Sequence, residues 1–359
     1  MSDLLSDFKL ISKKACNSIT PKVSIVIPFF NRQGDLKKNL DQLMSVLTIP
    51  FELILINDSS EDETLEELLE WQQAQSSSSH VLVDISLYGS SKQQFETRCD
   101  AFGILQSRSN LVLEIQADMY IVEKGFDQRL VDSISSSNDF IAISGRGCHT
   151  FEEVYDSFQS SMGAATFDDM SFLGFLSNRF LAFMRLLVRG QEGVKNQFLA
   201  EASDQFEFTE LNNLLFPSLE IFQLSGKAGK LGQLINSDLK TPESLSRLIW
   251  TSETVMRGPL LIEKNKYLEL GGFDIESFFL GYDEHDLFLR ASLVGYRCGY
   301  VPIDFLSPLK SGTSRARRSW KTEYALTKNL FRIWKNRNTC AITVSYYEKP
   351  LSVPQIRNF

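Results

Sequence analysis

Residues 22–58, KVSIVIPFFNRQGDLKKNLDQLMSVLTIPFELILIND, contain the pattern that decides the fold. Residues 22–28 form a largely β-branched apolar run that ends in proline, and residues 51–56 form a second apolar run. Uninterrupted runs of this kind are typical of parallel strands that are buried on both faces. Between them, residues 34–46 have the spacing of an amphipathic helix. The stretch therefore predicts a strand–helix–strand unit in a parallel sheet.

The same alternation continues along the chain. We expect helices at 61–75 and 93–106 and further strands at 81–83, 111–115, 140–144 and 256–262, with a polar loop at 76–79. Residues 1–20 are expected to form a short helical or loose extension. Strands that alternate with helices predict an α/β fold with a doubly wound, mostly parallel sheet, whose ligands bind beyond the carboxyl ends of the strands.

Polar side chains fall at three of these strand ends. Asn31 follows the first strand, Asp58 the second and Asp118 the strand at 111–115. Taken one by one, Asn31 and Asp58 suit turns and helix caps, and Asp118 suits a structural strand-end carboxylate. Taken together, they predict a ligand site at one edge of the sheet.

A second informative stretch is Gly271–Arg290, GGFDIESFFLGYDEHDLFLR. Its acidic cluster, residues 283–286, lies on the first turn of an amphipathic helix. One carboxylate is enough to cap that helix, and Asp283 suits this role by accepting the Asp286 N–H. Adjacent helical residues point about 100° apart. We therefore expect Glu284 to serve a purpose other than capping.

These stretches together resemble GT-A glycosyltransferases of the family 2 type. The segments that carry the resemblance are VSIVIPFFNR, NDSSEDET, EIQADM, and the GGFD stretch with its DEHDL cluster and Gly295-Tyr296, within about residues 21–145 and 255–305. The resemblance implies a GT-A type, Rossmann-like, mostly parallel sheet flanked by helices, with a helical insert on the acceptor side. It also implies inverting transfer of a sugar from a nucleoside diphosphate sugar to the hydroxyl of a glycan or lipid-linked acceptor.

The resemblance also implies roles for individual residues. The base is expected to be Glu284, with Asp283 as its alternative; Asp118 and Gln116 are expected to hold Mg²⁺ or Mn²⁺. The expected donor contacts are Pro28, Asn31, Asp58, Arg98 and Arg257, and the expected acceptor contacts are Gly272, Phe273, His285 and Asp286. Gln116 stands where the metal motif of the family has a carboxylate, and no histidine follows His285. These departures weaken the expectation that the protein depends on a metal.

Composition narrows the class of protein. The chain has 359 residues, of which 43% are hydrophobic and 23% charged, as is ordinary for a globular protein. A net charge of -8 argues against general binding of nucleic acid. Five scattered cysteines indicate reduced thiols, and neither a secretory signal nor a membrane-spanning segment is expected. We therefore expect a cytoplasmic protein, with peripheral attachment to a membrane as an alternative.

The expected organisation is an N-terminal extension (1–20), a nucleotide-sugar-binding half (21–150), a helical variable insert (151–250), an acceptor and catalytic half (251–310) and a basic C-terminal segment (311–359). Within the insert, residues 172–188 are apolar but contain two arginines. They fit a buried helix of the acceptor side, or an interfacial helix on a membrane that carries a lipid-linked acceptor.

Two further functions stay open. A catalytically silent nucleotide- or glycan-binding protein on the same fold would explain Gln116, but it would not need the acidic cluster. A nucleotidyltransferase would want a glycine-rich, basic phosphate loop after the first strand, where this chain has residues 29–33, FFNRQ. The dinucleotide, P-loop and zinc-protease motifs are absent from the sequence.

Overall fold

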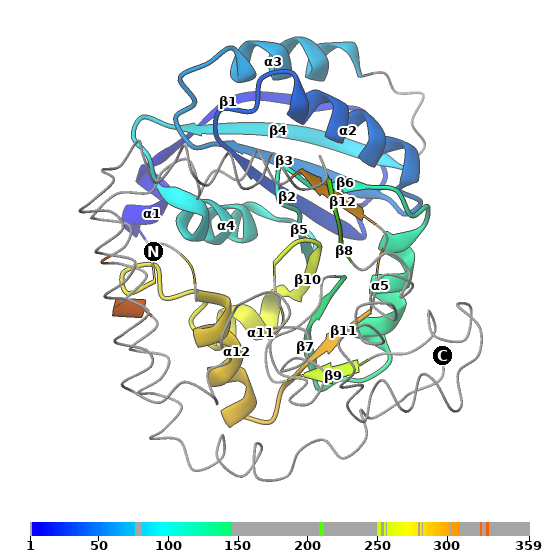
Figure 1. The fold of residues 1–359 in the computed structure, drawn as a ribbon, viewed down its shortest axis with the longest axis vertical. Helices are drawn as coiled ribbons and strands as arrows, with labels where there is room; N and C mark the ends of the chain where they lie inside the picture. The colour runs from blue at the N-terminus through cyan, green and yellow to red at the C-terminus, as the bar shows by residue number, and fades with distance from the viewer. Residues whose placement is uncertain are drawn as a thin grey trace.

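The fold in the computed structural model is a mixed α/β arrangement around one large sheet (Figure 1). The structure describes residues 2–75, 81–145, 208–211, 250–252, 255, 257–278, 281, 283–301, 303, 305–308, 324 and 328–329. The large sheet has nine strands in the order β1-β4-β3-β2-β5-β10-β7-β11-β9. The pairings make β2, β3, β4, β5, β7 and β11 run in one direction. The predicted α/β fold with a mostly parallel sheet is confirmed.

The first half of the chain has the expected strand–helix alternation. In order, it contains β2 (Val23–Phe29), α2 (Asp35–Val46), β3 (Phe51–Asn57), α3 (Thr64–Ala74), β4 (Leu82–Ser90), α4 (Phe95–Gln106) and β5 (Leu111–Glu114). Strands β4, β3, β2 and β5 are neighbours and parallel, so their carboxyl ends meet at one edge of the sheet.

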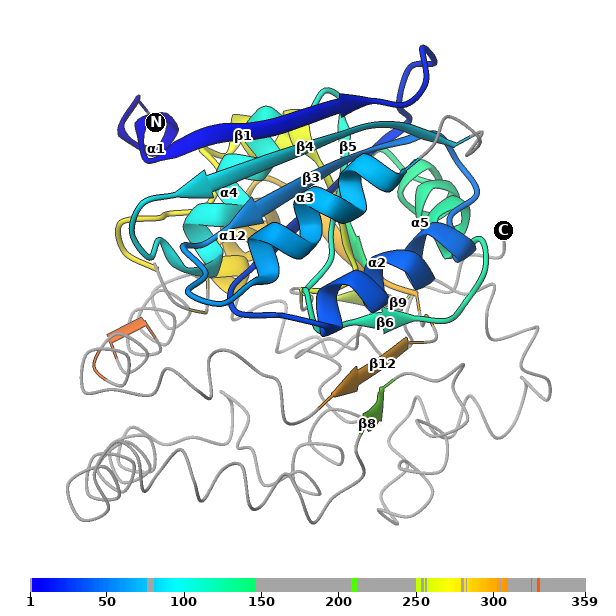
Figure 2. The same cartoon turned by 90° about the horizontal axis from the view of Figure 1, so that it is seen from above.

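Later segments extend this sheet. After β6 (Tyr120–Ile121), α5 (Phe126–Ser135) and β7 (Phe140–Ser144), the strand β10 (Leu260–Glu263) inserts antiparallel between β5 and β7. Helices α11 (Lys264–Glu269) and α12 (Asp283–Leu293) follow. Strand β11 (Arg297–Tyr300) pairs parallel with β7, and β9 (Trp250–Ser252) pairs antiparallel with β11 as the last strand of the sheet. A separate sheet joins β6, β12 (Phe305–Pro308) and β8 (Phe208–Leu211), as Figure 2 shows. Strands from residues 8–144 and from residues 250–300 therefore share the nine-stranded sheet.

The N-terminal segment differs from the sequence expectation. Helix α1 (Ser2–Ser6) is followed by β1 (Phe8–Ala15), which pairs antiparallel with β4 at the edge of the sheet. The prediction of a helical or loose extension is therefore wrong for residues 8–15. An edge strand with one open face lacks the apolar run of a central strand, and its lysines give it a polar appearance.

The two faces of the sheet explain why its central strands are apolar throughout. Alternate side chains of β2 enter different cores: Ile25 and Ile27 pack with α2, α3 and α5, whereas Val26 packs with α4 and α12. Because successive strand residues point to opposite faces, a strand covered on both faces must be apolar at every position. Figure 1 shows α4 and α12 together on the side away from α2 and α3.

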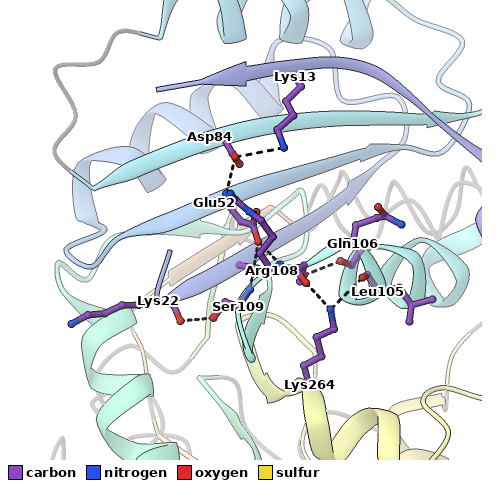
Figure 3. Close-up of polar contacts among 12 residues, drawn as sticks. Lys13, Lys22, Glu52, Asp84, Leu105, Gln106, Arg108, Ser109 and Lys264 are labelled. Atoms are coloured by element: carbon purple, nitrogen blue, oxygen red, sulfur yellow. Dashed lines mark hydrogen bonds and ion pairs between the residues drawn. The ribbon is translucent and has the colours of Figure 1, made fainter. Parts of the chain in front are cut away.

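A polar network connects the amino-terminal ends of the parallel strands, at the opposite end from their carboxyl ends (Figure 3). Arg108 pairs with Glu52 of β3 at 2.6 Å and with Asp84 of β4 at 2.7 Å. Ser24 of β2 donates to Glu52 at 2.5 Å, and Lys264 donates to the carbonyl oxygen of Ser107 at 2.6 Å. This network stabilises the sheet away from the strand ends that were expected to bind a ligand.

Several predictions concern residues outside the described part of the chain. These are the apolar stretch 172–188, almost all of the insert 151–250, and the basic segment 311–359 apart from residues 324 and 328–329. Among the described residues, no helix combines the length and the apolar character that crossing a membrane requires. The described cysteines, Cys16, Cys99 and Cys298, are buried.

Candidate functional site

The turns after β2 and β3 are bound to each other. Asn31, in the left-handed region at φ 49°, donates its N–H to Ser60 Oγ at 3.0 Å. Its Oδ1 accepts the Glu61 N–H at 2.8 Å. The N–H of Arg32 donates to Thr64 Oγ1 at 2.8 Å. Asn31 therefore joins two strand-end turns, and its donor contact stays a prediction.

Asp58 holds the start of α4. Its Oδ1 accepts the Gln94 N–H at 2.5 Å, and its Oδ2 accepts the Phe95 N–H at 3.1 Å. Asp58 is buried, so this carboxylate gives its negative charge to the N-terminal end of a helix. The structure thus gives Asp58 an architectural role, and its contact with a nucleobase stays a prediction.

The turn after β5 carries the two expected metal ligands. Asp118 forms an ion pair with Arg32, in which Arg32 Nη2 lies 3.2 Å from Asp118 Oδ2. Gln116 donates through Nε2 to Glu96 Oε1 at 2.9 Å. The guanidinium of Arg32 thus puts a positive charge beside the carboxylate to which a divalent cation was assigned.

The donor set at this turn fits a divalent cation in a limited way. Hard cations bind carboxylate and amide oxygens, and Mg²⁺ is commonly held by one or two carboxylates together with the phosphates of a substrate. Asp118, with a side chain 17% exposed, and the amide oxygen of Gln116 are such donors. Within the described ranges, no group of three or more His, Cys, Asp or Glu side chains has the geometry of a metal site. These residues fit a cation that relies on the phosphates of its nucleotide for most ligands.

The acidic helix α12 begins at Asp283, as the sequence predicts. The cap that was assigned to Asp283 is wrong: this residue is already helical, and its carboxylate contacts Arg257. Its side chain is 0% exposed, and its role as the alternative base stays a prediction.

Glu284 has a different environment from its neighbour. Its side chain is 14% exposed, and its Oε1 lies 3.9 Å from His285 Nδ1. Burial acts to raise the pKa of Glu284, but Arg257 and His285 outweigh it and lower this pKa to about 2. The carboxylate is therefore ionised at neutral pH, as a proton acceptor must be.

Arg257 lies in the centre of a buried cluster of acids. Burial raises the pKa of Asp100, Asp283 and Glu114, that of Glu114 to about 8. Glu114 therefore holds its proton at neutral pH, which reduces the negative charge around the guanidinium. The Arg257 side chain is 7% exposed and bound to carboxylates, and its expected contact with the diphosphate stays a prediction.

Three of the residues expected to contact the acceptor are bonded between the GGFD turn and its neighbours. They are Gly272, Phe273 and Asp286. Asp286 pairs with Arg290 at 2.9 Å, and Arg290 Nη2 donates to the carbonyl oxygen of Gly272 at 2.7 Å. Phe273 is buried, and its N–H donates to Tyr267 Oη at 3.1 Å. Gly272 and Asp286 thus fasten the GGFD turn to the helix, and acceptor contacts for these residues and His285 stay predictions.

The two remaining residues expected to contact the donor are Arg98 and Pro28. Arg98 pairs with Asp7 at 2.8 Å and with Glu276 at 3.2 Å, and so connects α4 to the N-terminal segment and to the loop before α12. Pro28 lies within β2 opposite Ile56 of β3.

The sequence interpretation missed the charged partners: Arg32, Glu96, Asp100 and Glu114. For Glu114 a signal existed, because an ionisable residue inside an apolar strand requires a buried partner. Glu96 and Asp100 are four residues apart on α4, a spacing that places them on one face. Only the fold could indicate that this face meets Arg257.

Solved structures with some likeness to this chain are glycosyltransferases. One is GalNAc-T7 with UDP, GalNAc and Mn²⁺, with a TM-score of 0.49 and 13% identity over 94% of this chain and 52% of that one. Another is the mannosyltransferase PcManGT from Pyrobaculum calidifontis with GDP-Man and Mn²⁺, with a TM-score of 0.44 and 12% identity over 92% of this chain and 76% of that one. Because both TM-scores are below 0.5, neither likeness supports a conclusion about the site.

Sequence comparison finds a matching family model and a similar glycosyltransferase. An uncharacterized glycosyltransferase of Synechocystis sp. (strain ATCC 27184 / PCC 6803 / Kazusa) is 31% identical over 104 residues, which are 28% of this chain and 30% of that protein. Residues 24–94, from β2 to the turn before α4, match the model of Glycosyl transferase family 2. Over these residues the chain is similar to the family 2 glycosyltransferases, and it spans less than a third of the relative that it matches.

Proposed function

We propose that this protein transfers a sugar from a nucleoside diphosphate sugar to an acceptor hydroxyl, with inversion at the anomeric carbon. The observation that carries the proposal is the meeting of two groups at one edge of the sheet. Asn31, Asp58 and Asp118 follow parallel strands, and Arg257 joins the end of β5 to the start of α12, where Glu284 is ionised.

Glu284 is the proposed base. Of the acidic pair, it has the less buried side chain, 14% exposed, whereas Asp283 is completely buried against Arg257. A carboxylate with a pKa of about 2 is a weak base in the ground state. It can still accept the hydroxyl proton as the acceptor oxygen bonds to the anomeric carbon, because the hydroxyl becomes more acidic as that bond forms.

In the proposed reaction, the acceptor oxygen attacks the face of the anomeric carbon opposite to the diphosphate. The bond between the anomeric carbon and the diphosphate oxygen breaks, and the proton passes to Glu284. Asn31, Asp58 and the turn at residues 116–118 would bind and orient the donor. Mg²⁺ or Mn²⁺ held by Asp118 and Gln116 would offset the charge that develops on the leaving diphosphate.

A second candidate is a nucleotide- or glycan-binding protein without catalysis. Two contacts favour it: Arg32 pairs with the carboxylate of Asp118, and Gln116 binds Glu96. The two candidates differ in whether donor binding leads to breakage of the sugar–phosphate bond.

The test is a Glu284→Gln variant assayed with a panel of UDP- and GDP-sugars plus Mn²⁺. We expect transfer, or slow hydrolysis of the donor, to fall by a factor of about 10² to 10⁴. Binding of UDP or GDP, followed by calorimetry, should stay within a few-fold of wild type because the base does not hold the nucleotide. Activity close to wild type would remove Glu284 from the mechanism. Wild-type protein that binds nucleotide but never cleaves a donor would favour the silent binder.

A further inference from the structure

Arg257 connects the acidic helix to the donor side of the sheet. Its guanidinium Nη2 contacts Asp283 on α12 and lies 3.3 Å from Asp100 on α4. The other contacts are Glu96 at 3.6 Å, Glu114 at 3.8 Å, and the ring of Phe273, 5.1 Å from the guanidinium carbon to the ring centre. One side chain thus joins β5, α4, α12 and the GGFD turn.

The backbone beside Arg257 has little room to move. Gly258 adopts a positive φ of 64°, and a Cβ atom there would lie 2.4 Å from Met119 Sδ and 3.1 Å from Gln116 Cγ. The chain at residues 257–258 therefore lies directly against the turn that carries Gln116. Glu96, which pairs with Arg257, also accepts the Gln116 amide. A continuous set of contacts runs from the turn after β5 to the first turn of α12.

Arg257 cannot be replaced by an equivalent charge. A guanidinium presents five N–H donors in a planar fork and can bind several carboxylates, whereas an ammonium is a compact point charge. Asp283 is completely buried, so loss of its contact with Arg257 would leave a polar group without compensation. The first turn of α12 would shift to satisfy it, and Glu284 would move with that turn.

We propose that Arg257 is a positioning residue: by binding Asp283, it holds the first turn of α12 so that Glu284 lies at the carboxyl edge of β5. This inference rests on the proposed function, in which Glu284 is the base. It differs from the sequence expectation, in which Arg257 contacts the donor diphosphate.

The test compares Arg257→Lys with Arg108→Lys. Both substitutions keep the positive charge and remove a guanidinium that binds at least two carboxylates. Arg108, however, lies where the parallel strands begin, at the other end of the strands from Arg257 (Figure 3). For Arg257→Lys we expect kcat to fall by about 10²-fold, because small errors in the position of a base are costly, with the Kd for UDP or GDP nearly unchanged. For Arg108→Lys we expect a lower unfolding midpoint and an unchanged kcat.

Two outcomes of this comparison would overturn the proposal. A kcat within two-fold of wild type in Arg257→Lys would show that Glu284 does not need this anchor. A parallel weakening of nucleotide binding would instead assign Arg257 to the donor diphosphate.

A second measurement does not need a substrate. The ring carbons of His285 can be followed by NMR as the pH is changed, because Nδ1 lies 3.9 Å from the Glu284 carboxylate and the sequence contains three histidines in all. Glu284 interacts with Arg257, His285, Asp283, Asp100 and Glu114.

Ionisation of the Glu284 carboxylate should produce an inflection in the pH dependence of the His285 signal, and in Arg257→Lys this inflection should move to higher pH. The signal of His285 is identified by its loss in His285→Gln. An unchanged inflection refutes the proposal whether or not the protein is a transferase. A moved inflection in a protein without any transfer activity upholds the link between Arg257 and Glu284 and refutes the proposed function alone.

Discussion

At the scale of single residues, two arginines determine the charge at the carboxyl edge of the sheet. Arg32 pairs with Asp118 after β5, and Arg257 pairs with Asp283 at the start of α12. The partners are 86 and 26 residues apart in the sequence. Each arginine is paired with a carboxylate to which metal binding or catalysis had been assigned. A metal or a substrate would therefore have to compete with the arginine for that carboxylate.

The pair between Arg32 and Asp118 leads to a prediction about metal binding. In Arg32→Gln, the carboxylate of Asp118 no longer has to give up a cationic partner before it binds a metal. A charge-assisted contact of about 1.4 kcal/mol corresponds to a factor of about ten in affinity. We therefore expect Mn²⁺ to bind about tenfold more tightly to Arg32→Gln than to wild type, by titration calorimetry without nucleotide.

The controls for this prediction are Arg32→Lys, which keeps the charge, and Asp118→Asn, which removes the carboxylate. We expect Arg32→Lys to bind Mn²⁺ about as wild type does and Asp118→Asn to bind it more weakly. Equal Mn²⁺ affinity in wild type and in Arg32→Gln would contradict the competition between the guanidinium and the metal.

At the scale of elements, α4 is the helix that connects the two parts of the site. Its start is held by Asp58, and its first turns carry Glu96 and Asp100 toward Arg257. It approaches the sheet closely at Gly103, where a Cβ atom would lie 2.3 Å from Val26 Cγ1 and 2.9 Å from Ile56 Cδ1. The position of the acids around Arg257 therefore depends on a helix that can lie this near to β2 and β3.

Gly103→Ala tests that close approach. Alanine favours helix by about 1 kcal/mol over glycine, but overpacking a tight interface costs about 1–3 kcal/mol. We expect a net loss of stability, measured by urea unfolding, together with weaker activity as α4 moves outward.

The matched comparison adds Val26→Ala, which removes the clashing methyl groups. The double variant should lose less stability than the sum of the two single variants, because the residues interact directly. A stabilising effect of Gly103→Ala alone would mean that α4 does not lie this close to the sheet.

At the scale of the whole molecule, the acids around Arg257 couple stability to pH. Burial raises the pKa of Glu114 from 4.5 to about 8. The positive charge of Arg257 acts to lower this pKa, and the negative charge of Asp283 acts to raise it. Between these two values the unfolded chain has lost this proton and the folded protein keeps it, so the folded state binds more protons. Stability from this group is therefore highest below about pH 4.5 and decreases as the pH rises to about 8.

The Glu114→Gln variant should remove this pH dependence. An amide of similar shape has no proton to lose, so the unfolding free energy should fall less steeply between pH 5 and pH 8, and the variant should exceed wild type in stability at pH 8. Glu276→Gln serves as the control, because the Glu276 side chain is 83% exposed. An identical slope in wild type and Glu114→Gln, measured by urea unfolding at each pH, would contradict the assignment.

The sequence by itself determined the central strands, the helices between them and the meeting of Asn31, Asp58 and Asp118 at one edge. These features follow from local apolar periodicity and from the common direction of parallel strands. The same local information placed Glu284 on the first turn of a helix.

Only the tertiary structure decided which charges are partners. The antiparallel insertion of β10 between β5 and β7 brings Arg257 to the end of β5, and no local pattern specifies that neighbour. The edge strand β1 was missed for a related reason: one open face leaves it without the apolar run that marks a buried strand. Contacts between distant segments depend on the order of strands in the sheet, and this order is a property of the whole fold.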